Sequence, residues 1–292
     1  MPQILHSNRS WSYDYRILQG TFSDSQINNY INKKRKHFDL IVNSWTPETN
    51  SEWIHRNYLA GKMLMASTIL LTSFEYGKRK NIKITEPYSI YYALFNCCRG
   101  LLFTQPLALW KDGNLFEISH NGLSRQIENA LSEIDNKFTS TFLNRFKEAR
   151  DIREAFSYKF PSNGLSNFTN FSYYNEYSVI DDCSILAEIS QLNSEILVAA
   201  LEEGSPVIND EECELNDKFI EFDFGDDVGF EEEDYYRLGK HIRKYKKPYT
   251  IQTTMTEGLV DDFFGAWIPS DTDLDDDDYN PDYRNNIIFD FF

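Results

Sequence analysis

The sequence has few cysteines, no long apolar run and no excess of positive charge. Its 292 residues include only four cysteines, and their spacing matches neither a disulfide framework nor a CxxC zinc site. The adjacent Cys97 and Cys98 are expected to be core thiols, with reactivity as the alternative. No apolar run approaches the roughly 20 residues that a spanning helix needs, and no secretion signal is recognisable. We therefore expect a soluble, cytoplasmic protein.

Sequence motifs of common cofactor and hydrolase sites are also absent. GxxxxGK[ST], GxGxxG after a strand, HExxH and GxSxG do not occur. Four aspartates alternate at intervals like those of a calcium loop: Asp271, Asp273, Asp275 and Asp277. However, the loop's glycine position holds Asp276 and its final glutamate position holds Asp282. We expect no metal and no cofactor, and calcium binding stays a minor alternative that calorimetry can test.

Charge divides the chain into two unlike parts. The chain is 41% hydrophobic and 15% aromatic, enough for a substantial core. Its net charge of −17 argues against a dedicated binder of the phosphate backbone. Residues 1–201 carry 21 Lys and Arg against 20 Asp and Glu, whereas residues 202–292 carry 8 against 26. The acidic excess therefore lies in the last third, beyond the Gly and Pro stop signals near residue 205.

The acidic segment, residues 205–292, is also rich in aromatic residues. Its acidic runs are 210–212, 231–234 and 275–278, and its aromatic stretches are 219–224, 263–267 and 287–292. A purely solvating tail has few aromatics, so we expect this segment to dock on its own core or on a partner. Alternation over 219–224 predicts a short strand. The segment as a whole is expected to be α+β or irregular.

The charge of this segment has two interpretations. Its acidic surface either keeps the chain soluble, or it docks a protein partner or mimics a nucleic acid. A basic patch interrupts it: Arg237, Lys240, Arg243, Lys244, Lys246 and Lys247. We expect the basic patch to pair with neighbouring acidic runs rather than with nucleic acid.

Hydrophobic periodicity predicts a mainly α-helical bundle over residues 61–204. Apolar residues recur at helical spacing in five segments: 63–76, 88–103, 121–132, 139–158 and 178–201. Short joins between such helices are typical of an all-α bundle. Residues 1–60 hold several aromatics and are expected to form an arm packed on the core, with one helix around 25–40 and otherwise packed loops.

Two of the predicted helices carry arginines on or beside an apolar face. Arg99 lies on an aromatic face of 88–103, and Arg150 and Arg153 border the apolar stripe of 139–158. An unpaired buried charge is costly, so Arg99 needs an anion or several acceptors. It either bridges helices, for instance to Glu148 or Asp151, or it binds a ligand.

His120 also has two interpretations. If Ser119 is the N-cap of a helix that opens at Asn121 or Gly122, His120 merely precedes that helix. Alternatively, His120 converges with Arg99 and Arg153 on one phosphate group. The second interpretation depends on how the helices pack.

At several of these positions the sequence resembles a known family. The segments that carry the resemblance are Pro87–Phe95 with Arg99, Ser119–Leu123, and Ala149–Arg153 with Tyr158. They are similar to a HEPN-type helical domain, and the layout with an aromatic N-terminal arm is similar to the bacterial YaaC-like proteins. The resemblance covers about residues 55–200.

The resemblance implies a helical bundle that often dimerises. Many HEPN domains are metal-independent ribonucleases of toxin–antitoxin or phage-defence systems, and others have lost catalysis and serve as binding or assembly modules. Their hallmark is an Arg followed a few residues later by His, in which Arg stabilises phosphate charge and His moves protons. Here Tyr158 stands where that His is expected after Arg153, and tyrosine, with a pKa of about 10, is a poor base at neutral pH.

The sequence therefore predicts a non-catalytic binding or assembly component of a bacterial antiviral defence or toxin–antitoxin system. No catalytic residue is firm; the candidates are Arg99, His120, Arg153 and Tyr158. The candidates for binding phosphate or RNA are Arg99, Arg150 and Arg153. Expected partners are a protein, through the acidic segment, and a second copy, through the bundle; RNA is a further candidate and no membrane is expected. Two alternatives stay open: a metal-independent ribonuclease that uses Arg153, Arg99 and His120, and an acidic nucleic-acid mimic.

Overall fold

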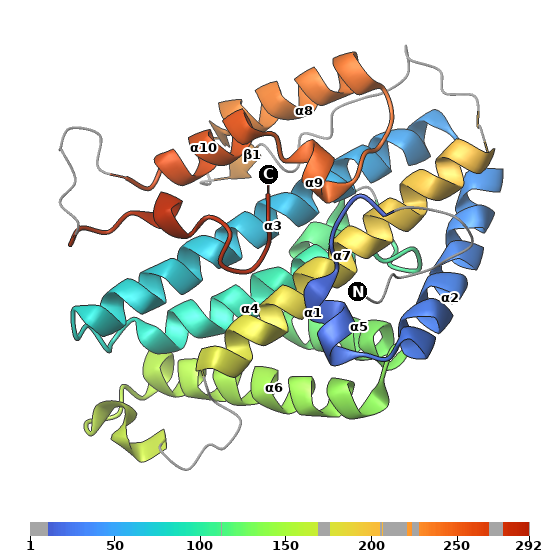
Figure 1. Ribbon diagram of the computed structural model, residues 1–292. Helices are drawn as coiled ribbons and strands as arrows, with labels where there is room; N and C mark the ends of the chain where they lie inside the picture. Colours follow the sequence, from blue (N-terminus) through green and yellow to red (C-terminus); the bar gives the residue numbers. More distant parts are fainter. Residues whose placement is uncertain are drawn as a thin grey trace.

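The computed structural model is mainly helical (Figure 1) and describes residues 11–111, 113–168, 176–204, 206, 221–223, 228–268 and 277–291. Its α-helices are α1 (Arg16–Thr21), α2 (Asp24–Asn43), α3 (Pro47–Arg79), α4 (Glu86–Phe103), α5 (His120–Ser132), α6 (Asn136–Tyr158), α7 (Glu176–Gly204), α8 (Glu232–Tyr245), α9 (Ile251–Thr254) and α10 (Glu257–Gly265). Short 3₁₀ turns occur at η1 (Asn114–Glu117), η2 (Gly164–Phe168) and η5 (Pro281–Arg284), and β1 (Glu221–Asp223) pairs antiparallel with β2 (Val228–Phe230). The predicted helical bundle is confirmed.

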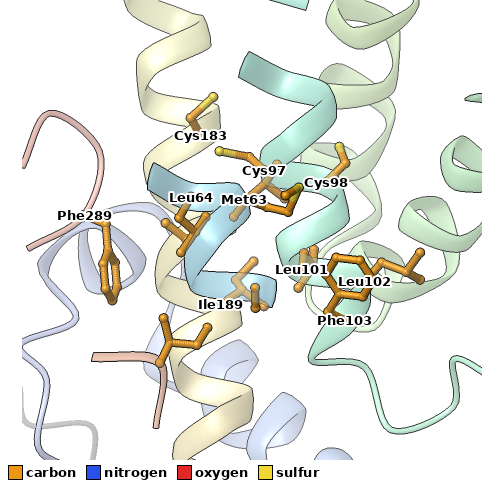
Figure 2. Close-up of a cluster of buried hydrophobic side chains, with 14 of the residues drawn as sticks. Met63, Leu64, Cys97, Cys98, Leu101, Leu102, Phe103, Cys183, Ile189 and Phe289 are labelled. Carbon is orange, nitrogen blue, oxygen red and sulfur yellow. The ribbon is translucent and has the colours of Figure 1, made fainter. Parts of the chain in front are cut away.

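The centre of the bundle is formed by α3, α4 and α7. Side chains from all three helices meet there, and Phe289 from the C-terminal end joins them (Figure 2). Gly100 of α4 permits the close approach of α3, because a Cβ at this position would lie 3.3 Å from the Ala60 carbonyl oxygen. Within the described residues, α7 is the one helix long and apolar enough to cross a membrane, and 94% of its apolar stretch is buried inside the protein. Its apolar character is therefore that of a core helix.

The helix starts follow capping signals in the sequence. The Ser23 side chain and Gln26 form a reciprocal capping box before α2, and the Asp135 carboxylate accepts a hydrogen bond from the Phe138 N–H (2.6 Å) at the start of α6. The expectation of loops between residues 40 and 60 was wrong. Thr46 caps α3, which runs unbroken from Pro47 to Arg79, so the boundary expected at residues 60 and 61 falls inside a helix.

The described part of the N-terminal arm is held by two buried glutamates of α7. Glu195 accepts hydrogen bonds from the Tyr13 N–H (3.2 Å) and the Tyr15 hydroxyl (2.8 Å). Glu188 accepts from the Ile17 N–H (3.2 Å) and the Leu18 N–H (2.7 Å) at the start of α1. Since 188 and 195 are seven residues apart, both carboxylates lie on one face of α7. They fix the arm along the core helix.

Burial of Glu188 makes the stability of this attachment depend on pH. Burial raises the pKa of Glu188 from 4.5 to about 7, although its two backbone hydrogen bonds oppose the rise. Between those values the folded chain binds more protons than the unfolded chain, so this group's stabilising contribution falls as pH rises. We expect the wild type to gain about 2–3 kcal/mol relative to Glu188→Gln when the pH falls from 7.5 to 4.5.

Urea unfolding of both proteins at the two pH values measures this difference. Glu128→Gln, at an exposed position on α5, is the matched control and should follow the wild type. If the wild type and Glu188→Gln show parallel pH dependence, the Glu188 carboxyl does not titrate in this range.

The acidic segment docks on its own core through its described helices. Its apolar residues Leu238, Ile251, Met255, Phe264 and Phe289 belong to the same buried cluster as α3, α4 and α7. Gly61 of α3 leaves room for this docking, because a Cβ there would lie 2.6 Å from the Met255 sulfur. The buried phenylalanines of this part therefore belong to the protein's own core, while Trp267 and Tyr283 stay on the surface.

The strand and ion pairs expected in this segment are seen in part. β1 covers the middle of the predicted strand, while residues 219, 220 and 224 lie outside the described residues. Arg237 of the basic patch forms ion pairs with Glu233 (3.5 Å) and Asp262, as expected. Of the alternating aspartates, Asp277 forms an ion pair with Lys80 (2.9 Å), and the other three lie outside the described residues.

Candidate anion-binding site

A buried arginine of α6 lies over two tyrosines of α4. The Arg153 guanidinium carbon is 4.8 Å from the Tyr91 ring centroid and 5.7 Å from that of Tyr92. Arg153 is only 7% exposed, and its Nε has no hydrogen-bond partner. A guanidinium keeps its charge at all ordinary pH values, and an unsatisfied buried donor costs about 1–3 kcal/mol. An anion that reached this donor would relieve that cost.

The same tyrosine joins Arg153 to His120. A hydrogen bond of 2.5 Å links the Tyr91 hydroxyl and His120 Nδ1, and the His120 ring also packs on Phe95 with centroids 4.6 Å apart. The Ser119 hydroxyl accepts a hydrogen bond from the Gly122 N–H (3.2 Å), so Ser119 is the N-cap of α5. The capping interpretation of this position is confirmed, and capping of α5 also places His120 beside Tyr91. Convergence of His120, Arg99 and Arg153 on one phosphate group stays a prediction.

The site favours neutral side chains around a fixed positive charge. Partial burial, followed by the charges of Arg153 and Arg150, lowers the pKa of His120. Burial raises the pKa of Tyr91 to about 12, although Arg153 opposes the rise. At neutral pH, His120 and Tyr91 are therefore both uncharged, and the arginines supply the positive charge.

Arg150 lies one turn before Arg153 at the edge of the site. Its Nη1 donates a hydrogen bond to Asn121 Oδ1 (2.9 Å), and its Nε lies 3.6 Å from Asp151 and 3.9 Å from Glu154. Two carboxylates thus offset part of its charge. We name His120, Arg150 and Arg153, together with Tyr91 and Tyr92, the cationic cluster.

Arg99 packs on two phenylalanines of α4, and Tyr158 lies on the surface. The Arg99 guanidinium carbon is 5.9 Å from the ring centroids of both Phe95 and Phe103, and burial lowers its pKa to about 10. Phe95 thus contacts both Arg99 and the His120 ring. Tyr158, five positions after Arg153 along α6, is 80% exposed, so the tyrosines in contact with Arg153 are those of α4 instead.

The sequence predicted Arg153 and His120 as candidates but did not single out Tyr91, which joins them, or Asn121, which binds Arg150. A buried hydroxyl needs a partner, but α4 carries several hydroxyl residues besides Tyr91, so the sequence alone does not point to this one. It carried no signal for Asn121 either.

The cysteines and possible metal ligands do not add to this site. Cys97, Cys98 and Cys183 are free and fully buried, as expected of core thiols, and burial raises the pKa of Cys98 and of Cys183. Over the ranges described above, no three His, Cys, Asp or Glu side chains gather in a way that could hold a metal ion.

Comparison with known proteins gives no relative: no family model, no curated protein and no solved structure matches this chain. The likeness to HEPN and YaaC-like proteins therefore rests on the sequence segments alone.

Proposed function

We propose that the protein is a cytoplasmic, HEPN/YaaC-like binding component that holds a phosphate group, foremost of RNA, at the cationic cluster. The observation that supports this most is Arg153, which is buried and charged and has an Nε donor without a partner. Charge-assisted hydrogen bonds from Arg to phosphate are short and frequently bidentate. Arg150 adds charge at the edge, and neutral His120 adds a hydrogen-bonding nitrogen.

The same geometry favours binding over cleavage. Metal-independent cleavage of RNA needs one group to take a proton and another to give one. The Nδ1 atom of His120 is already hydrogen-bonded to the Tyr91 hydroxyl. Tyr91 has a pKa of about 12 and therefore stays protonated at neutral pH. The family resemblance places Tyr158 in the proton-transfer position. Tyr158 is exposed, whereas Arg153 is buried.

The setting and the partner of this component come from the family resemblance and the charge pattern. We place it in a bacterial antiviral defence or toxin–antitoxin system, with the acidic segment contacting a protein partner. Phe264, Phe289 and Phe291 of the described part pack inward, whereas Tyr235 and Tyr236 of α8 are exposed beside the acidic residues Glu232 and Glu233. This exposed acidic face is the surface that such a partner would meet.

Titration of His120 by NMR, with and without inorganic phosphate, tests the phosphate site. A phosphate held by Arg153 brings negative charge close to His120, so we expect the pKa of His120 to rise by about one unit. Arg153→Gln should abolish this rise, whereas Arg125→Gln, at an exposed position on α5, should preserve it. An unchanged pKa of His120 in saturating phosphate would contradict the proposal.

A second candidate function is a noncanonical, metal-independent ribonuclease. The observation that favours it is that Tyr91 joins His120 to the site of Arg153, which places an imidazole beside the cations. Under this alternative, wild-type protein cleaves RNA in EDTA, and both His120→Ala and Arg153→Gln remove the activity.

The acidic mimic is a third candidate function. Capture of a basic nucleic-acid-binding protein by the acidic segment would favour it.

A further inference from the structure

A cavity of about 450 Å³ lies between the C-terminal half of α3, the start of α7 and the chain around η5. Figure 1 shows this last part of the chain, in red, running beside α3. Residues that line the cavity include Thr72, Tyr76, Arg79, Ile180, Tyr279 and Tyr283. None of these belongs to the cationic cluster, so the inference is independent of the proposed function. A volume of this size is typical of small-molecule sites.

Aromatic side chains form one part of the cavity wall. The rings of Tyr76 and Tyr279 pack edge to face, with centroids 5.5 Å apart. Tyr279 is held in place, because its hydroxyl accepts a hydrogen bond from the Ser73 hydroxyl (2.8 Å) and donates one to the Ile69 carbonyl oxygen (3.3 Å). Tyr283 is 69% exposed and also lines the cavity. A planar ring in the cavity could therefore pack against these tyrosine rings, either face to face with an offset or edge to face.

Positive charge gathers at the rim. Arg79 lies with its guanidinium carbon 5.8 Å from the Tyr76 ring centroid, next to Lys78 on the same turn of α3. Arg284, from η5, forms an ion pair with Glu75 (2.7 Å) across the cavity mouth. The lining residues carry three cations against Glu75 and Asp278, so the rim is net positive and suits an anion.

We propose that this cavity binds a planar aromatic molecule that carries one anionic group. The ring enters the cavity beside Tyr76, Tyr279 and Tyr283, where it can stack on aromatic side chains. The anionic group stays at the rim with Arg79 and Lys78. Tight binding needs both the ring and the anionic group, because the aromatic wall contacts only the ring and the cationic rim contacts only the charge.

Calorimetry on the full chain tests this with three probes: 1-naphthyl phosphate, 1-naphthol and inorganic phosphate. We expect 1-naphthyl phosphate to bind at one site per chain, and 1-naphthol and phosphate to bind at least tenfold more weakly. Binding of phosphate alone with the same affinity would show a simple anion patch and overturn the proposal. Absence of binding by all three probes would overturn it too.

Variants at exposed positions locate the site without disturbing the core. Arg79→Gln and Tyr283→Ala should each weaken 1-naphthyl phosphate binding at least tenfold, and Arg243→Gln, an exposed arginine of α8, should leave it unchanged. If affinity is unchanged in both Arg79→Gln and Tyr283→Ala, or falls in Arg153→Gln instead, the probe binds elsewhere and the assignment is wrong.

Discussion

Asp234→Ala is expected to lower the free energy of unfolding by about 3–5 kcal/mol. Asp234, near the start of α8, is 6% exposed. It accepts a hydrogen bond from the Tyr58 hydroxyl (2.5 Å) and forms an ion pair with Lys62, and both partners belong to α3. Burial and the neighbouring Asp234 charge raise the pKa of Tyr58 well above its usual value. Removal of the carboxylate leaves a buried hydroxyl and a partly buried ammonium without their acceptor.

Urea unfolding gives the free energy, and limited proteolysis reports whether α8 detaches. Glu233→Ala is the matched control, because Glu233 is the neighbouring acid, is largely exposed and forms an ion pair with Arg237. Exposed pairs contribute about 0–1 kcal/mol, so this variant should stay close to the wild type. Equal losses in the two variants would mean that Asp234 does not anchor the acidic segment.

Asp182→Ala is expected to have an effect of similar size, again about 3–5 kcal/mol. Asp182 of α7 is 1% exposed and accepts two hydrogen bonds from the Arg145 guanidinium of α6, one of them 2.6 Å from Nε. Burial raises the pKa of Asp182, although Arg145 opposes the rise. The pair joins α6, which carries Arg150 and Arg153, to the core helix. Its loss therefore weakens the support of the cationic cluster as well as the fold.

The control for this variant is Asp181→Ala, at the exposed neighbouring position. It should change the free energy of unfolding by less than about 1 kcal/mol. Replacing both partners with apolar residues, Arg145→Met with Asp182→Leu, should recover most of the lost stability, because no charge is then left buried and unpaired. A double variant that is as unstable as Asp182→Ala would show that the pair is not the cause of the loss.

The helices of the bundle could be predicted because their signals are local. Apolar periodicity and the Ser119 cap lie within a few residues of the elements they define, and α5 and α6 were found close to their true bounds. The start of α3 was missed although Thr46 and Pro47 signal a helix start. The sequence predicts packed loops of an arm for the aromatic residues that follow, whereas the structure buries Trp53 and Tyr58 within α3.

The two candidate sites depend on contacts between distant parts of the chain. Tyr91 meets His120 because α4 packs beside α5. The cavity needs Tyr279 to reach Ser73, which lies 206 positions earlier in the chain. Periodicity shows which face of a helix is apolar, but it does not show which distant segment covers that face.

The most direct test of the account combines RNA binding and RNA integrity in one experiment. End-labelled single-stranded RNA is incubated with full-length protein in EDTA, and both the bound fraction and the length of the RNA are measured. The account predicts bound RNA of unchanged length in the wild type, and affinity about 10–100-fold lower in Arg153→Gln, because hydrogen bonds to charged groups are worth about 1.5–3 kcal/mol. Shortened RNA in the wild type, restored to full length by His120→Ala, would show that the cationic cluster cuts its ligand and would contradict the account.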